Sequence, residues 1–312
     1  MKKILICLLI IISGFTFVGC GKEETASVPE KTITIGVMPD VESIPFIIAE
    51  KNGYFEKEGV KVKIEHFKSA ADRDSALHTG KLDGVITDIL AVVFANEGGI
   101  NLKIIAKNDG NIELMAGKNS GINTADELKG KNIGLSTNTI MEYSLDKMLE
   151  AAQLKAEDVN KAAIPPLPTR LEMLQGGKID AAILPEPLAG LAVKNGAKVL
   201  NSTDQMANKA GAIAFTGKSL QESPAEVKAV FRAYNDAVAY IQKEPASSYI
   251  DFVIQEQGFP AAIKDTIKLP KYSKAELPSE KILNDVVQWM KGKNLIKGNY
   301  EYKDLVADKV LR

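Results

Sequence analysis

Short apolar runs alternate along the chain with longer stretches in which apolar residues recur at helical spacing. One of these stretches starts near Ser43, has Pro45 in its first turn and stops at Asn52-Gly53, as expected of a helix. A second helix is predicted from Ser69, which can form a capping box with Asp72. The runs on either side of these helices are rich in β-branched residues and predict strands at residues 32–38, 60–67 and 85–87. This alternation predicts an α/β fold.

The same order of elements returns about one hundred positions later. The decapeptide LHTGKLDGVI at residues 77–86 is matched by LQGGKIDAAI at 174–183, and Arg73 and Arg170 are likewise 97 positions apart. Strands are predicted at residues 131–136, 162–164 and 181–184, with helices that start at 137–139 and near 170. We therefore expect two similar lobes with open mixed sheets. The shared decapeptide closes a helix and opens a strand in each lobe, so its acidic residues, Asp83 and Asp180, are predicted to be structural.

Ligands of open α/β sheets bind beyond the carboxyl ends of the strands, which here predicts a cleft between the lobes. Several segments at those ends are helix N-termini, whose free N–H groups favour an anionic ligand. Tyr143, one turn into its helix, is expected to cover that ligand. The candidate binding residues are Asp40, Ser43, Ser69, Asp72, Arg73, Thr87, Asp88, Thr137, Asn138, Thr139, Tyr143, Arg170 and Glu186.

Two of the candidates point to a different ligand charge. Asp88 and Glu186 follow third strands, and a carboxylate in the cleft would repel a simple anion but suit an amine. A zwitterion or a cationic heterocycle is therefore an alternative. Asp88 is also placed to cap the helix that follows it, and Arg73 and Arg170 could pair with these acids or with the ligand.

The N-terminal residues have the pattern of an export signal. Lys2 and Lys3 precede an apolar run at residues 4–12, and this run is far shorter than the roughly 20 residues that span a membrane. The sequence FVGC at residues 17–20 resembles the bacterial lipoprotein box. Residues 1–20 are thus interpreted as a lipoprotein signal peptide, with Cys20 as the lipidated residue and residues 21–31 as a flexible tether.

A set of motifs in this chain resembles one family of proteins, the nitrate, sulfonate, taurine and thiamine-precursor substrate-binding proteins of ABC importers. The resemblance extends from Thr32 to about Pro187. It rests on NGYFEKEGV at residues 52–60, GKLD at 80–83, LKGKNIG at 128–134 and GKIDAA at 177–182.

This resemblance implies a periplasmic-binding-protein fold of type II, whose two lobes are joined by two crossing strands and close on a small ligand. We place these hinge strands at Ile112–Ala116 and Gly211–Thr216. Lobe I then comprises residues 32–112 and 217–312, and lobe II residues 113–216. The expected partners are a small-molecule ligand, an ABC permease with its ATPase subunits, and the outer face of the membrane, reached through the lipid. We expect a monomer.

The composition narrows the classes of function. Basic and acidic residues nearly balance at a net charge of −1, which gives no bulk attraction to nucleic acid. The two histidines, His66 and His78, form no metalloprotease motif, and neither a metal site nor a cofactor site nor an enzyme is predicted. The only tryptophan, Trp289, lies outside the cleft segments, so none of these segments offers an indole on which an aromatic ring could stack. This makes the alternative ligand, a pyrimidine or other heterocyclic vitamin precursor, less favoured. A sensor lipoprotein is a further alternative.

Overall fold

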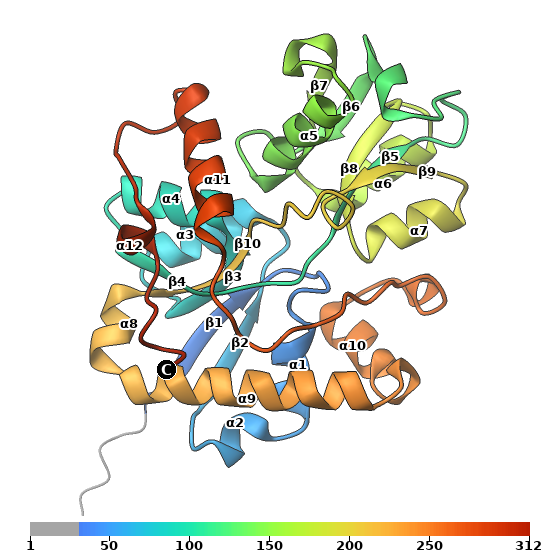
Figure 1. The fold of residues 1–312 in the computed structure, drawn as a ribbon. Helices are drawn as coiled ribbons and strands as arrows, with labels where there is room; N and C mark the ends of the chain where they lie inside the picture. Colours follow the sequence, from blue (N-terminus) through green and yellow to red (C-terminus); the bar gives the residue numbers. More distant parts are fainter. Residues whose placement is uncertain (1–30) are drawn as a thin grey trace, which may run out of the picture. The chain divides into compact units, whose positions relative to one another are not determined.

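Two five-stranded mixed sheets organise residues 31–312, the part of the chain that the computed structural model describes (Figure 1). The first sheet has the order β2-β1-β3-β10-β4 and the second has the order β7-β6-β8-β5-β9. The strands of the first sheet are β1 (Ile33–Val37), β2 (Val62–His66), β3 (Gly84–Asp88), β4 (Leu102–Lys107) and β10 (Gly211–Thr216). Those of the second are β5 (Ile112–Ala116), β6 (Asn132–Leu135), β7 (Asn160–Ala163), β8 (Ala181–Pro185) and β9 (Lys198–Ser202).

Helices cover both faces of each sheet, and the buried apolar residues form two clusters in each lobe. The helices of the first lobe are α1 (Ile44–Lys51), α2 (Tyr54–Lys57), α3 (Ala70–His78), α4 (Ile89–Glu97), α8 (Gly217–Glu222), α9 (Pro224–Lys243), α10 (Ile250–Gln257), α11 (Glu280–Gly292) and α12 (Tyr302–Leu305). Those of the second are α5 (Ile140–Ala151), α6 (Leu167–Gln175) and α7 (Leu188–Lys194). The predicted fold class, two α/β lobes with mixed sheets, is confirmed.

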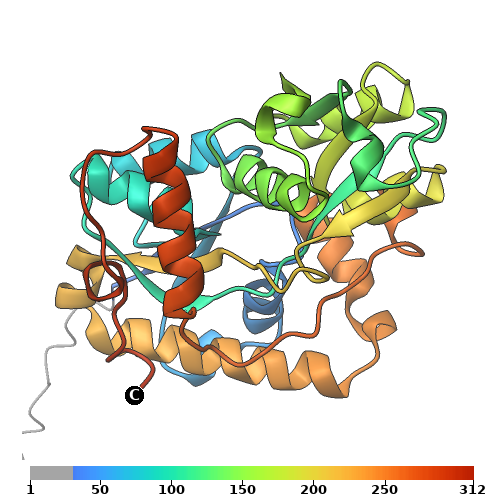
Figure 2. The same ribbon diagram turned by 45° about the horizontal axis from the view of Figure 1, so that its top comes forward.

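The chain crosses between the lobes twice, but not at the predicted residues. Gly211–Thr216 was expected to cross and to end lobe II; instead it is β10, which pairs antiparallel with β3 and β4 inside the first sheet. Ile112–Ala116 is likewise β5, inside the second sheet between β8 and β9. Both runs are almost wholly buried apolar residues, and such runs need ladder partners on both sides. The crossings are therefore the connections 108–111 and 203–210, which run side by side between the lobes in Figures 1 and 2.

A buried arginine joins helix and sheet in the same way in each lobe. Arg73 Nη1 donates to the carbonyl oxygen of Ile86 at 2.9 Å, and Arg170 Nη1 donates to that of Ile183 at 2.7 Å. Each arginine side chain packs over a strand glycine. A Cβ on Gly134 would lie 2.5 Å from Ile179 Cδ1 and 3.2 Å from Arg170 Cγ.

The repeated decapeptide has the predicted structural role. Asp83 Oδ2 accepts a hydrogen bond from the backbone N of Thr34 at 2.9 Å, and Asp180 Oδ2 accepts one from that of Asn132 at 2.8 Å. Both carboxylates therefore tie the start of one strand to its neighbour. The glycine before each of them has a left-handed φ, which ends the preceding helix.

The C-terminal segment returns to the first lobe through the long helix α9, which lies along that lobe in Figure 1. It then reaches the first crossing, where Ser273 N donates to Asp109 Oδ2 at 2.7 Å. Further along, α11 packs beside α4 and presents Asp285 and Trp289 to the second lobe. The C-terminal third of the chain thus supports the first lobe and one of the crossings.

The predicted signal peptide, the lipidated Cys20 and residues 21–30 of the tether lie outside the described residues. Lys31, the last residue of that predicted tether, forms ion pairs with Asp83 at 3.5 Å and Glu222 at 3.3 Å. Across residues 31–312, no helix combines the length and the apolar character that a membrane crossing requires.

We predict that Gly134→Ala lowers the free energy of unfolding by about 1–3 kcal/mol, because the added methyl group must displace Ile179 and Arg170. Urea denaturation measures the change. Gly292→Ala is the matched control, since its new Cβ would meet no atom within 4 Å, and it should raise stability by about 0.5–1 kcal/mol. Equal effects of the two substitutions would contradict the packing argument.

Candidate functional site

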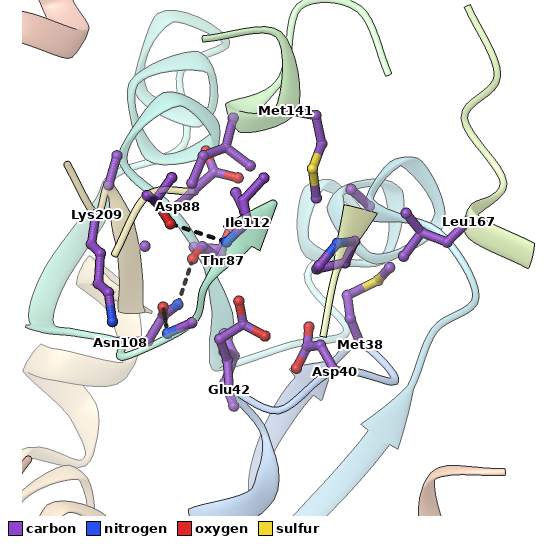
Figure 3. Close-up of a pocket in the computed structure, with 18 of the residues that line it drawn as sticks. Met38, Asp40, Glu42, Thr87, Asp88, Asn108, Ile112, Met141, Leu167 and Lys209 are labelled. Carbon is purple, nitrogen blue, oxygen red and sulfur yellow. Dashed lines mark hydrogen bonds between the residues drawn. The ribbon is translucent and has the colours of Figure 1, made fainter. Parts of the chain in front are cut away.

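A cavity of about 100 Å³ lies between the two sheets (Figure 3). It is lined by both lobes and by both crossings. The first lobe and the two crossings contribute Met38, Asp40, Glu42, Ala70, Arg73, Ile86, Thr87, Asp88, Asn108, Gly110, Lys209, Ala210 and Gly211. The second lobe contributes Ile112, Ile140, Met141, Leu167 and Pro185, and the start of the second crossing contributes Thr203.

Two carboxylates enter the cavity from the turn between β1 and α1. Asp40 Oδ1 accepts a hydrogen bond from the backbone N of Ser43 at 3.1 Å, and burial raises the pKa of Asp40 despite this bond. Burial and the charge of Asp40 raise the pKa of Glu42 well above its usual range. The Glu42 carboxylate lies against Gly110, where a Cβ would be 1.9 Å from Glu42 Oε1, so any larger residue at position 110 would displace this carboxylate.

A third carboxylate, Asp88, stands at the end of β3. Its Oδ1 accepts a hydrogen bond from Ala91 N at 2.9 Å and so caps α4, as the sequence predicts. Only 9% of Asp88 is exposed. Burial raises its pKa to about 6, although the Arg73 guanidinium acts in the opposite direction.

The two cationic side chains of the lining already have partners. Arg73 Nη2 lies 2.8 Å from Asp74 Oδ1, and Lys209 Nζ lies 2.5 Å from Asp204 Oδ1. Neither of these partner carboxylates lines the cavity. Each cation is therefore paired with a partly exposed carboxylate outside the cavity, but Arg73 Nη2 itself makes no hydrogen bond among residues 31–312.

The crossings are fixed to the end of β3 by Asn108. Its Nδ2 donates to the carbonyl oxygen of Thr87 at 3.0 Å, and its Oδ1 accepts from Gly110 N at 3.2 Å. A Cβ on Gly211, the first residue of β10 just after the second crossing, would lie 2.0 Å from Asn108 Oδ1. The two crossings thus meet beside the cavity, where a change of angle between the lobes would alter its width.

Comparison with known proteins identifies the family. The family model described as NMT1/THI5 like matches residues 40–248. The chain belongs to this family. A relative in Bacillus subtilis (strain 168), provisionally named an aliphatic sulfonates-binding protein, is 30% identical over 257 residues, 78% of this chain and 75% of the relative. Another in Brachyspira hyodysenteriae, provisionally named an ABC transporter periplasmic binding protein, is 28% identical over 216 residues, 64% of this chain and 62% of the relative.

Solved structures agree with this assignment at the level of the fold. The alkanesulfonate-binding protein SsuA of Xanthomonas axonopodis pv. citri, solved with MOPS bound, matches with a TM-score of 0.76 at 17% identity. The match covers 89% of this chain and 98% of that one. The resemblance inferred from the sequence motifs is confirmed, and the fold of this NMT1/THI5-like chain is that of periplasmic binding proteins.

Four of the predicted site residues line the cavity of this NMT1/THI5-like protein, namely Asp40, Arg73, Thr87 and Asp88. In the first lobe the other three do not. Ser43 is fully buried, and its hydroxyl donates a hydrogen bond to Asp40 Oδ1 at 2.7 Å. Ser43 therefore positions the Asp40 carboxylate without lining the cavity itself. Ser69 caps α3 by accepting from the backbone N of Asp72 at 3.2 Å, and Asp72 itself is exposed.

The predicted residues at the start of α5 also lie outside the lining. Thr139 Oγ1 caps the helix by accepting from Met141 N at 3.2 Å, while Thr137 and Asn138 are exposed. Asn138 has a left-handed φ of 57° and donates its backbone N–H to Glu142 Oε2 at 2.7 Å. These residues shape the turn into α5, and the neighbouring apolar side chains face the cavity in their place.

Arg170 and Glu186 are buried within the second lobe. Arg170 donates to the backbone oxygens of Ile164 and Ile183, and burial lowers its pKa to about 10. Glu186 Oε2 accepts from Gly190 N at 3.1 Å, and burial together with Glu113 raises its pKa to about 7. Both side chains hold the second lobe together and are not in the cavity lining.

Tyr143 does not cover the cavity but links the lobes. Its ring is fully buried against Trp289 of α11, with centroids 5.7 Å apart, and its hydroxyl donates to Asp285 Oδ2 at 2.6 Å. Lys293, just beyond α11, adds an ion pair to Glu142 Oε1 at 2.5 Å. These side chains form the α5–α11 contact together with Asp146 and Lys147, and this contact joins the second lobe to the first.

Several residues of the lining were not predicted as site residues, because no local sequence pattern marks them. Glu42 lies between the predicted site residues Asp40 and Ser43, and in the structure its carboxylate lies against Gly110 of the first crossing. Asn108 and Lys209 lie on the true crossings, next to strands that the sequence reading took for the crossings themselves. Among residues 31–312 there is no group of three or more His, Cys, Asp or Glu side chains that could hold a metal ion.

We predict that Glu142→Gln reduces stability at neutral pH and flattens its loss in acid. Burial alone would raise the pKa of Glu142, but hydrogen bonds from Asn138 N, Lys161 and Lys293 outweigh it and lower the pKa to about 2. A lowered pKa adds stability above the usual value of 4.5, and this stability is lost as pH falls toward 2. Urea denaturation at pH 7, 4 and 3 tests this. Exposed Glu157→Gln is the control; a wild-type pH profile in E142Q would refute the prediction.

Proposed function

We propose that this NMT1/THI5-like protein is the extracytoplasmic solute-binding lipoprotein of an ABC importer. It would capture a small organic anion or zwitterion in the cavity between the lobes and deliver it to a membrane permease with its ATPase subunits. The protein would act as a monomer, outside the cytoplasmic membrane and held to it by a lipid on Cys20. Binding, and no chemical conversion, would be its task.

The observation that carries this proposal is the position of the cavity. Parallel strands of both sheets end at it, and both crossings border it, so a solute in the cavity touches every part that moves when the lobes change their angle. Only a ligand with more contacts in one arrangement than in another can shift the equilibrium between them. A cavity lined by both lobes meets this condition.

The α5–α11 contact supports a closing mechanism. Ion pairs and a buried tyrosine hydroxyl join the lobes some distance from the cavity, and these groups would face water if the lobes separated. Because such contacts are individually weak in water, they would bias the lobes toward closure while leaving the final step to the ligand.

The relatives guide the choice of ligand class. Two of them are named for sulfonates, which favours an organic sulfonate or a taurine-like zwitterion. The carboxylates of the cavity also suit a nitrogen heterocycle, so a pyrimidine or another vitamin precursor is the second candidate.

A thermal-shift panel on the full-length protein in detergent tests the function. Sulfonates, taurine, nitrate, pyrimidine precursors and small amines are added singly, and a true ligand at 100 times its Kd should stabilise the fold by roughly 2.7 kcal/mol. The ligand should be recovered unchanged from the protein. Conversion of the ligand to a product would contradict the proposal, as would the absence of any stabilising compound.

Lipid anchoring has a separate test. We expect the wild-type protein to sediment with membranes, and Cys20→Ser to appear in the soluble extracytoplasmic fraction with the same ligand-induced thermal shift. Mass spectrometry of the mature wild-type N-terminus should show an acylated cysteine. An unmodified N-terminus with unchanged membrane association would disprove the role of Cys20.

A further inference from the structure

The cavity has more acidic than basic groups available to a ligand. Its lining contains three carboxylates, Asp40, Glu42 and Asp88, and all three come from the first lobe. Its two cations, Arg73 and Lys209, already lie within ion-pair distance of Asp74 and Asp204, which are outside the lining. Carboxylates therefore outnumber free cationic groups on the first-lobe side, where Arg73 Nη2 is the guanidinium nitrogen that is covered from solvent without a hydrogen-bond partner among residues 31–312.

One of these carboxylates has an unused acceptor. Glu42 Oε2 is covered from solvent and has no hydrogen-bond partner among residues 31–312. A buried acceptor without a donor costs free energy, so the chain keeps it there at the expense of stability. In Figure 3 the carboxylates of Glu42 and Asp40 lie beside each other at the edge of the cavity, within reach of one bound group.

The opposite wall has a different character. The second lobe presents Ile112, Ile140, Met141 and Leu167, with no charged side chain in the lining from that lobe. Figure 3 shows Met141 entering the cavity from the side that faces Asp40 and Glu42. Apolar side chains with an adaptable methionine bind an apolar or polarisable part of a ligand.

From this two-sided lining we propose that the solute carries a protonated nitrogen, held by Asp40, Glu42 and Asp88, and an apolar body that packs against the second-lobe wall. This rests on the proposed function and narrows its ligand class: a zwitterion or an organic cation binds, and a nitrogen-free sulfonate does not. The nitrogen donates to the free oxygen of Glu42 and replaces the missing positive charge. Closure of the second lobe then covers the body of the ligand.

Matched pairs of compounds test the proposal by isothermal titration on the full-length protein in detergent. Each pair differs in one nitrogen: taurine and isethionate, 3-aminopropanesulfonate and propanesulfonate, pentylamine and pentanol. In at least one pair we expect the amine to bind at least tenfold more tightly than its nitrogen-free partner. Equal or tighter binding of the nitrogen-free sulfonates would overturn the inference but leave the binding function in place.

Near-isosteric variants locate the effect. Glu42→Gln and Asp40→Asn should reduce the amine-to-analogue ratio of affinities at least tenfold, and Asp88→Asn should do so while its amide oxygen still caps α4. The control is Asp72→Asn, an exposed carboxylate outside the lining, which should keep the wild-type ratio. The readout is a ratio of two affinities measured on the same variant, so a general loss of stability would not change it. An unchanged ratio in all three variants would refute the proposal.

If no compound of any pair binds, native mass spectrometry of the protein as isolated shows whether a solute co-purifies with it and what that solute is. A co-purified solute with a basic nitrogen supports the inference, and one without such a nitrogen overturns it. Absence of any solute together with absence of binding would overturn the proposed function as well, and the two failures are thereby distinguished.

Discussion

The architecture depends on one requirement, which is met twice: a guanidinium taken out of water must find hydrogen-bond acceptors. Arg73 and Arg170 each meet it with Nη1, which donates to the carbonyl oxygen of Ile86 in the middle of β3 and of Ile183 in the middle of β8. Each arginine comes from the helix before that strand, so one bond fixes the angle between helix and sheet. The side chain packs over a glycine of the neighbouring strand, such as Gly134, where a methyl group would displace Ile179 and Arg170. These bonds tie β3 and β8 to the helices that precede them, and the last residues of both strands, Asp88 and Pro185, line the cavity.

The residues that line the cavity lower the stability of the fold. Three carboxylates are brought together in a partly buried space, and burial raises the pKa of each of them. A fold selected for stability alone would place amides or apolar residues there. Binding sites commonly retain such unfavourable charge because the ligand supplies what is missing. The nearby Arg73 and Lys209 relieve only part of it, since each is also bound to a carboxylate outside the lining.

Contacts outside the cavity also join the two lobes. The α5–α11 contact places Tyr143 in the apolar core of the first lobe, although its helix belongs to the second. The C-terminal segment holds the first crossing through Ser273 and Asp109. These contacts hold the two lobes at the angle seen in the structure.

The sequence by itself determined the two similar lobes, the helix caps and the structural role of the repeated decapeptide, because capping and turn chemistry act between residues a few positions apart. It also placed Asp88 both as a cap and at the cavity. The tertiary structure alone decided which sheet Gly211–Thr216 joins, since an apolar run pairs equally well with either. It also decided that Tyr143 bonds to Asn208 and Asp285, which are 65 and 142 positions away. Partners at such separations leave no trace in local pattern, and the acidic character of the cavity arises from the same long-range packing.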